Sequence, residues 1–121
     1  MTDFHIGVVE AKFADIIWEN EPIASPDLVK KCENALNWKK STMYTVLRRL
    51  CEKGIFKNEN GIVSSQISRN DFYGKQSREY VAESFDGSLP AFLAAFTSEK
   101  KLNEKEIDEI QRMIDSFRKE V

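Results

Sequence analysis

The chain has 121 residues, of which 41% are hydrophobic and 31% charged, as in a soluble globular protein of one domain or two very small ones. No apolar run approaches the roughly 18 residues that a membrane span needs, and the N-terminus lacks the basic start and apolar core of a secretory signal. Two cysteines and one histidine are too few for a disulfide scaffold or a thiolate metal cluster. We therefore expect a cytoplasmic protein with no metal, no cofactor and no membrane contact.

The formal net charge of -2 conceals a basic block. Residues 24–58 carry eight Lys and Arg against three acids, an excess of +5, whereas residues 1–23 stand at -4 and residues 70–121 at -3. A basic block inside an acidic chain is typical of a local binding surface for phosphate. It is equally typical of the solvated face of ordinary helices, so charge alone leaves the two interpretations open.

The first half of the chain has the pattern of three short helices. Apolar residues at helical spacing predict an amphipathic helix over residues 6–19, which Pro22 interrupts. Ser25 and Pro26 then form a helix start, with Ser25 as the cap, and the second helix extends to about Leu36. A turn over residues 34–38 leads to a third helix over residues 40–53, which Gly54 ends.

Two short β-prone stretches follow, over residues 55–57 and 62–67. The Asn60-Gly61 pair between them is a strong signal for a tight hairpin. Three helices followed by a hairpin is the order of a winged helix-turn-helix domain, which we place at residues 1–69. The fold class that we expect is mainly α with this small hairpin.

Residues 70–121 have a helical pattern, with helices over 69–85 and 89–96 and a third that begins after Asn103. Asn103 and Glu106 have the spacing of a capping box. The apolar faces of these helices have little partner surface within some fifty residues, so we expect this region to form a homodimer. The side chains that we expect at the dimer interface are Phe85, Leu89, Phe92, Phe96, Ile107, Ile110, Ile114 and Phe117.

The helix over residues 40–53 has the composition of a major-groove recognition helix. Ser41, Thr42 and Thr45 stand opposite its apolar stripe, where short side chains can contact base edges and thymine methyl groups. The flanking residues predicted to contact DNA phosphates are Lys39, Lys40, Arg48, Arg49, Lys53, Lys57 and Asn58. The alternative is an exposed helix with ordinary polar residues. Glu59 has the wrong sign for a phosphate contact, so we expect the hairpin to add little affinity.

Catalytic chemistry has little support in the sequence. Cys32 and Cys51 both lie on apolar stripes, as core residues do, and His5 stands near the terminus. The sequence contains no glycine-rich phosphate loop and no Ser/His/Asp set. We therefore do not expect an enzyme.

The order of four motifs resembles the family of penicillinase and methicillin-resistance repressors, together with the related copper-transport repressors. The motifs are EAKFADIIW at residues 10–18, W-x3-T-x2-T-x-L-x-R-L-x2-K-G at 38–54, FDGSLPAFLAAF at 85–96 and LNEKEIDEIQRMI at 102–114. The resemblance implies a winged helix that binds a dyad-symmetric operator and a C-terminal half that dimerises. It also implies base contacts by Thr42 and Thr45, and for Arg49 either a phosphate contact or a structural ion pair.

The sequence departs from that family at several positions. Lys39 replaces the usual Ser or Asp cap, and Ile62 stands where the wing usually has Arg. Ala95 replaces the Asn of the Asn–Phe bond that is cleaved during induction of the antibiotic-resistance members, although Phe96 is present. The Cys-x-Cys motif of the copper-responsive members is not found. We therefore expect neither that proteolytic switch nor copper sensing through that motif.

These observations predict a homodimeric bacterial transcriptional repressor whose partner is a double-stranded DNA operator, with an upstream signalling protein as a further conceivable partner. The alternative is a winged-helix protein-interaction module that binds no DNA itself. The net charge of -2, the acidic hairpin and the missing Arg favour that alternative. A steep dependence of affinity on salt distinguishes the two.

Overall fold

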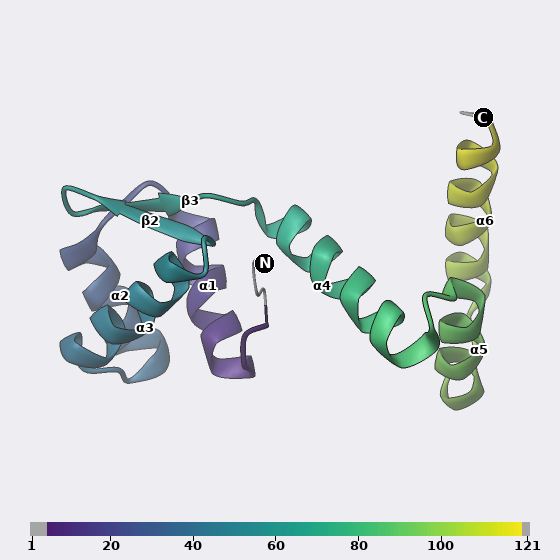
Figure 1. Cartoon of the computed structure of the whole chain (residues 1–121), viewed down its shortest axis with the longest axis horizontal. Helices are drawn as coiled ribbons and strands as arrows, with labels where there is room; N and C mark the ends of the chain where they lie inside the picture. The colour runs from purple at the N-terminus through teal and green to yellow at the C-terminus, as the bar shows by residue number, and fades with distance from the viewer. Residues whose placement is uncertain (1–4, 120–121) are drawn as a thin grey trace. The chain divides into compact units, whose positions relative to one another are not determined.

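The computed structural model describes residues 5–119 and divides the chain into two units, which meet between Glu79 and Tyr80. Helix α4 crosses this boundary, so its first residues belong to the first unit and its last to the second. Figure 1 shows the elements, which are α1 (Val8–Asn20), β1 (Ile23–Ala24), α2 (Ser25–Leu36), α3 (Lys40–Glu52), β2 (Phe56–Glu59), β3 (Ile62–Ser65), α4 (Arg69–Phe85), α5 (Leu89–Glu99) and α6 (Glu104–Lys119).

The first unit contains a three-stranded antiparallel sheet in the order β1-β3-β2. Asn60 and Gly61 form the loop of its hairpin, as their sequence predicts, but β2 extends beyond the predicted stretch 55–57, because Glu59 already pairs with Ile62. Both loop residues have a positive φ, 54° and 82°, as a two-residue hairpin turn of the preferred twist requires. The strand β1 is not predicted by the sequence, since two residues after Pro22 are too few to show an alternating pattern.

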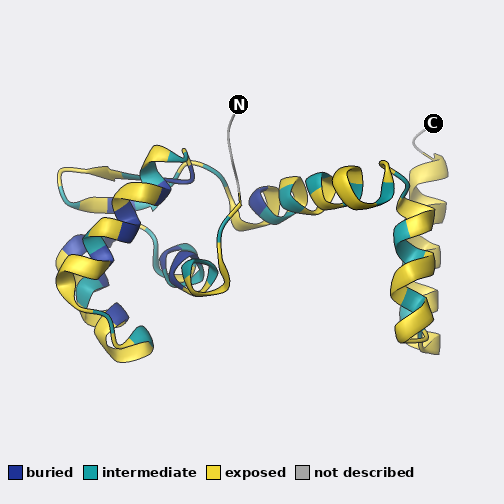
Figure 2. Cartoon of the chain, turned by 60° about the horizontal axis from the view of Figure 1, so that its bottom comes forward, coloured by how far each residue is buried: buried dark blue, intermediate teal, exposed yellow. Residues whose placement is uncertain are grey.

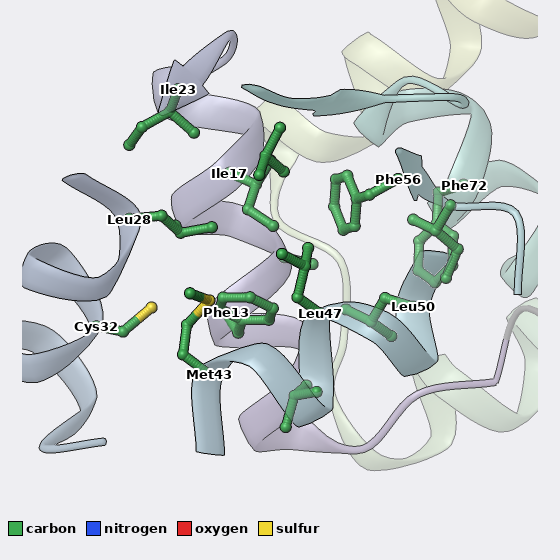
Figure 3. Packing of buried hydrophobic residues seen from close by; sticks show 14 residues of the cluster. Phe13, Ile17, Ile23, Leu28, Cys32, Met43, Leu47, Leu50, Phe56 and Phe72 are labelled. Carbon is green, nitrogen blue, oxygen red and sulfur yellow. The ribbon is translucent and has the colours of Figure 1, made fainter. Parts of the chain in front are cut away.

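The core of the first unit lies where α1, α2, α3 and the sheet meet (Figure 3). Its buried side chains include many of the apolar ones predicted from helical spacing, joined by residues from the strands and by Phe72 of α4. Val9, which the spacing places on the apolar face of the first helix, is instead 52% exposed. A fully buried Leu, Ile or Phe side chain contributes about 1.5–3 kcal/mol relative to exposure. The residues of this core are Phe13, Ala14, Ile17, Ile23, Leu28, Cys32, Met43, Val46, Leu47, Leu50, Ile55, Phe56, Val63 and Phe72.

The helix ends explain where α2 begins and where α3 stops. Gly54, at φ 81°, follows α3, and the backbone N–H groups of Gly54 and Ile55 donate to the carbonyls of Cys51 and Leu50. This is the glycine-dependent ending that the sequence predicts. The prediction for the start of α2 is wrong in one respect. The N-cap position is Ala24, and Ser25 is the first residue of the helix, where its Oγ accepts a hydrogen bond from the Tyr44 hydroxyl.

The second unit consists of the end of α4 with α5 and α6. The rings of Phe85 and Phe92 lie 5.6 Å apart between centroids, and Phe92 lies 6.1 Å from Phe96. Asn103 and Glu106 form the predicted capping box, with reciprocal hydrogen bonds of 3.1 and 2.8 Å. Figure 2 shows buried residues in the first unit and none in α5 or α6 as far as the chain is described. The predicted fold class, a winged helix-turn-helix followed by a helical region, is confirmed.

Candidate nucleic-acid interface

Helix α3 presents a polar face to solvent. Met43, Leu47 and Leu50 are buried on one side, whereas the residues predicted to contact DNA from this helix are exposed on the other. Those exposed residues are Lys40, Ser41, Thr42, Thr45, Arg48 and Arg49. Three residues, 37–39, connect α3 to α2, as in a helix-turn-helix pair. The core thus fixes the orientation of α3. The exposed face that carries these residues, called the reading face below, remains accessible to a ligand.

The start of α3 favours negatively charged ligands. Its N-cap residue is Lys39, which makes no side-chain capping hydrogen bond, so the first backbone N–H groups of the helix have no side-chain acceptor there. Lys39 and Lys40 are both exposed, and no acidic residue lies in the first turn. The positive end of the helix dipole and two ammonium groups therefore reinforce one another at this point.

Thr45 has a constrained hydroxyl group. Its Oγ1 donates a hydrogen bond of 2.9 Å to the backbone carbonyl of Ser41, one turn earlier. The proton of this hydroxyl is therefore used inside the helix, while the side chain as a whole remains exposed. What Thr45 offers to a ligand is its methyl group and the acceptor lone pairs of its oxygen.

An open groove runs between α3 and strand β2. Its lining combines apolar and polar side chains, namely Tyr44, Thr45, Leu47, Arg48, Cys51 and Asn58. The groove brings together two residues predicted separately, Arg48 from the helix and Asn58 from the hairpin. The guanidinium of Arg48 and the side-chain amide of Asn58 can each donate hydrogen bonds to phosphate oxygens.

Three other predicted phosphate contacts have partners within the chain. Arg49 Nη1 lies 3.6 Å from Glu10 Oε2 of α1, and Lys53 Nζ donates to the backbone carbonyl of His5. On the hairpin, Lys57 Nζ lies 3.3 Å from Glu59 Oε1. The Lys57–Glu59 pair neutralises the hairpin locally, so the hairpin attracts phosphate less than its lysine alone suggests.

The structure also reveals a contact that the sequence does not show. Tyr44 is half-buried beside the reading face, and its hydroxyl donates to Ser25 Oγ at a distance of 3.0 Å. Nineteen residues separate the two, and Ser25 in sequence has the ordinary signature of a helix cap. Neither spacing nor composition connects them, so only the packing of α2 against α3 could reveal this bond.

The residues predicted at the dimer interface all lie in the second unit, from the end of α4 onwards. Five of them are exposed, namely Leu89, Phe96, Ile107, Ile114 and Phe117, with exposed fractions of 42–58%. Phe85, Phe92 and Ile110 are half-buried. Met113, which is not among the predicted interface residues, is 56% exposed beside them on α6. A single chain thus leaves a substantial apolar surface uncovered in this unit.

The two cysteines are free thiols in apolar surroundings. Burial raises the pKa of the Cys32 thiol to about 11, and it raises the pKa of Cys51 as well, with a smaller contribution from the neighbouring carboxylate of Glu52. Raised pKa values keep both groups protonated at neutral pH, where a thiol is a poor nucleophile. Neither has the electropositive surroundings of a reactive cysteine.

The three helices, the hairpin and the exposed polar face of α3 together define a winged helix-turn-helix protein. No helix within residues 5–119 has the length and apolar character to cross a bilayer. A sequence model of the penicillinase repressor family matches residues 6–116, and the chain belongs to this family. Members of the family are transcriptional regulators, so the prediction of a repressor rather than an enzyme is confirmed.

Two relatives align over nearly their whole length. A penicillinase repressor of Staphylococcus aureus is 25% identical over 118 residues, which cover 94% of each chain. A penicillinase repressor of Bacillus licheniformis is 20% identical over 117 residues, which cover 93% of this chain and 91% of the relative. At 20–25% identity, three quarters or more of the aligned residues differ from those of each relative.

Proposed function

We propose that this repressor binds a dyad-symmetric DNA operator as a homodimer, with α3 of each subunit in the major groove. The observation that carries the proposal is the exposed face of α3, where Thr42 and Thr45 lie between Lys39 and Lys40 at one end and Arg48 at the other. Short side chains flanked by cations suit a helix that touches base edges while its neighbours hold the phosphates.

The residues that contact the DNA bases in this proposal are Ser41, Thr42 and Thr45. They lie in the first two turns of α3, and all three are exposed. Because the Thr45 hydroxyl proton is engaged by the Ser41 carbonyl, we assign Thr45 an apolar contact with a thymine methyl group through its own methyl. Ser41 and Thr42 remain available for hydrogen bonds to base edges.

Phosphate binding is distributed unevenly over the predicted cations. Lys39 and Lys40 at the start of α3, and Arg48 with Asn58 across the groove, are the principal contacts. Lys53 and Lys57 are secondary, since each has an internal partner. For Arg49 the distance of 3.6 Å to Glu10 favours the second of its two conceivable roles, an ion pair that ties α3 to α1.

Dimerisation is supported by the uncovered apolar residues of the second unit. Two copies related by a twofold axis place the same patch on each side, so Phe96, Ile114 and Phe117 of both chains can be covered at once. A symmetric dimer reads a symmetric site. Its half-sites are expected about 10 base pairs, or a multiple of that, apart from centre to centre.

Selection from a random duplex pool tests this function and yields the operator sequence at the same time. The protein is incubated with the pool at physiological salt, bound duplexes are recovered over several rounds, and the enriched sequences are read. We expect an inverted repeat to be enriched, with preferred base pairs in each half. Enrichment of a single unrepeated site would contradict the symmetric dimer, and the absence of any enriched sequence would contradict operator binding.

A further inference from the structure

Ser25 connects the hairpin to the recognition helix. It is the first residue of α2, and only 7% of its surface is exposed. Its backbone N–H donates a hydrogen bond of 2.8 Å to the carbonyl of Gly61 in the hairpin turn. Its Oγ accepts the hydrogen bond of 3.0 Å from the Tyr44 hydroxyl in the second turn of α3. One buried residue thus holds both elements that border the groove.

The bond to Gly61 clamps the tip of the hairpin. Ala24 pairs with Ile62 and Ile23 pairs with Val63, so β1 follows β3 up to the loop. The Ser25–Gly61 bond extends this pairing by one residue, to the loop itself. With its backbone held at the turn, the hairpin does not project freely from the domain.

The bond to Tyr44 acts on the reading face. Tyr44 is half-buried, and it lines the groove next to Thr45 and Arg48. A hydrogen bond from its hydroxyl to a buried acceptor fixes the direction of the ring and, through it, the position of the second turn of α3 relative to α2. Contacts to base edges depend steeply on distance and angle, whereas attraction between lysines and phosphates does not.

We infer that Ser25 is a positioning residue for operator recognition, acting through Tyr44. It holds α3 and the hairpin as one rigid surface, so that the threonines meet the bases in register. The inference rests on the proposed function, since it assigns a residue to the specificity of that same site. Ser25 is buried and does not itself need to touch DNA.

Tyr44→Phe tests the inference by removing only the hydroxyl that donates to Ser25. Affinities are measured by fluorescence anisotropy for the selected operator and for a scrambled duplex, with the wild type, Tyr44→Phe, Ser25→Ala and the double variant. Tyr73→Phe is the matched control, because it removes a hydroxyl from another half-buried tyrosine of the first unit, in α4. Melting temperatures of all variants show whether each remains folded.

The hydrogen bond is present in the free protein as well, so its loss weakens binding only through the lost preorganisation of α3, and its net free energy sets the upper limit of that effect. Each single variant should therefore lower operator affinity measurably, by no more than about tenfold. Affinity for the scrambled duplex should be unchanged, and the double variant should lose no more than either single one. Tyr73→Phe should match the wild type. If Ser25→Ala fails to fold, Ser25→Cys takes its place, because it keeps a side chain of similar size but offers only a weak hydrogen-bond acceptor.

Three results would overturn the inference. In the first, the wild type prefers the operator and Tyr44→Phe has the same preference. In the second, both single variants lose affinity but the losses multiply in the double variant, since the two groups would then act independently. The third is a direct contact between the Tyr44 hydroxyl and DNA, which would appear as a loss in Tyr44→Phe that Ser25→Ala does not reproduce. A wild type without any sequence preference would instead refute the proposed function.

Discussion

Arg49 of α3 and Glu10 of α1 form an ion pair, with Nη1 and Oε2 3.6 Å apart. Glu10 also accepts a hydrogen bond of 3.3 Å from the Gly7 backbone through its other oxygen, so one carboxylate serves both the start of α1 and the last turn of α3. Neighbouring Arg48 instead lines the groove with Asn58. Two adjacent arginines thus have different surroundings, and we expect different functions.

Salt dependence separates the two arginines. Each phosphate contact that is lost reduces the slope of log affinity against log salt by about 1. We expect Arg48→Ala to reduce the slope by about this amount and Arg49→Ala to leave it unchanged, while lowering stability by no more than about 1 kcal/mol because the pair is partly exposed. Anisotropy titrations over several salt concentrations measure the slope. An equal reduction in both variants would show that Arg49 contacts phosphate.

Substitutions of Thr45 test how the base is read. If the methyl group makes the contact, Thr45→Val should bind the operator nearly as the wild type does. Thr45→Ala should relax preference at one base pair, at a cost of roughly 1–3 kcal/mol. Affinities for operators altered at each base pair provide the measurement. Lys40→Ala is the control, since losing a phosphate contact should weaken all sequences about equally.

A different ranking of the two Thr45 variants, with Thr45→Val as weak as Thr45→Ala, would mean that the hydroxyl reads the base. Its oxygen can then accept a hydrogen bond from a base amino group with the bond to the Ser41 carbonyl intact, whereas donation to a base would require that bond to break. Unaltered sequence preference in both variants would remove Thr45 from the reading face altogether.

A charge placed in the apolar face of α6 should separate the subunits. Phe117 is 58% exposed, so Phe117→Asp removes little buried surface from the single chain and acts mainly on the assembly. Light scattering should give twice the chain mass for the wild type and the mass of one chain for this variant. Ser116→Asp adds the same charge to the neighbouring, exposed position and should remain dimeric. A wild type of single-chain mass at micromolar concentration would rule out the homodimer.

Cys32 makes stability depend on pH above neutrality. Its pKa is about 11 in the folded protein, raised by burial from an ordinary value near 9, so the folded state keeps the proton longer than the unfolded chain does. The contribution of Cys32 to stability is therefore complete below about pH 9 and is lost as pH rises toward 11. Thermal unfolding between pH 8 and 11 should show this loss in the wild type and a smaller one in Cys32→Ala. Equal slopes in the two proteins would contradict it.

Periodicity and turn chemistry predict most of the fold because the relevant signals are local. Helix α4 has the predicted bounds, α3 agrees to within a residue, and Asn60 with Gly61 forms the predicted turn. The turn predicted over residues 34–38 lies later in the chain, because α2 continues to Leu36 and residues 37–39 connect it to α3. Strand β1 is not predicted, because a strand of two residues is too short to show an alternating pattern. It is recognised only by its pairing with β3. The predicted cap of α2 is wrong, since the N-cap position is Ala24 and the Oγ of Ser25 bonds to a distant residue.

The residue types of the candidate site can be predicted from the sequence, but the ion pairs and hydrogen bonds that join its helices cannot. Helical spacing places Thr42, Thr45 and Arg49 along one face of α3, and the structure has all three exposed. The pairing of Arg49 with Glu10 and the bond between Tyr44 and Ser25 join different helices. Such contacts depend on how the helices pack, and a single sequence carries no pattern that specifies them.

Operator binding itself is tested most directly by fluorescence anisotropy with DNA from upstream of the protein's own gene, beside a scrambled duplex of equal length and composition. Small repressors often control their own genes, and the selected inverted repeat serves as a second target. We predict tighter binding to the native or selected duplex than to the scrambled one, and a linear fall of log affinity with log salt. Absence of binding to every duplex at low salt would contradict operator recognition and favour a winged-helix protein-interaction module.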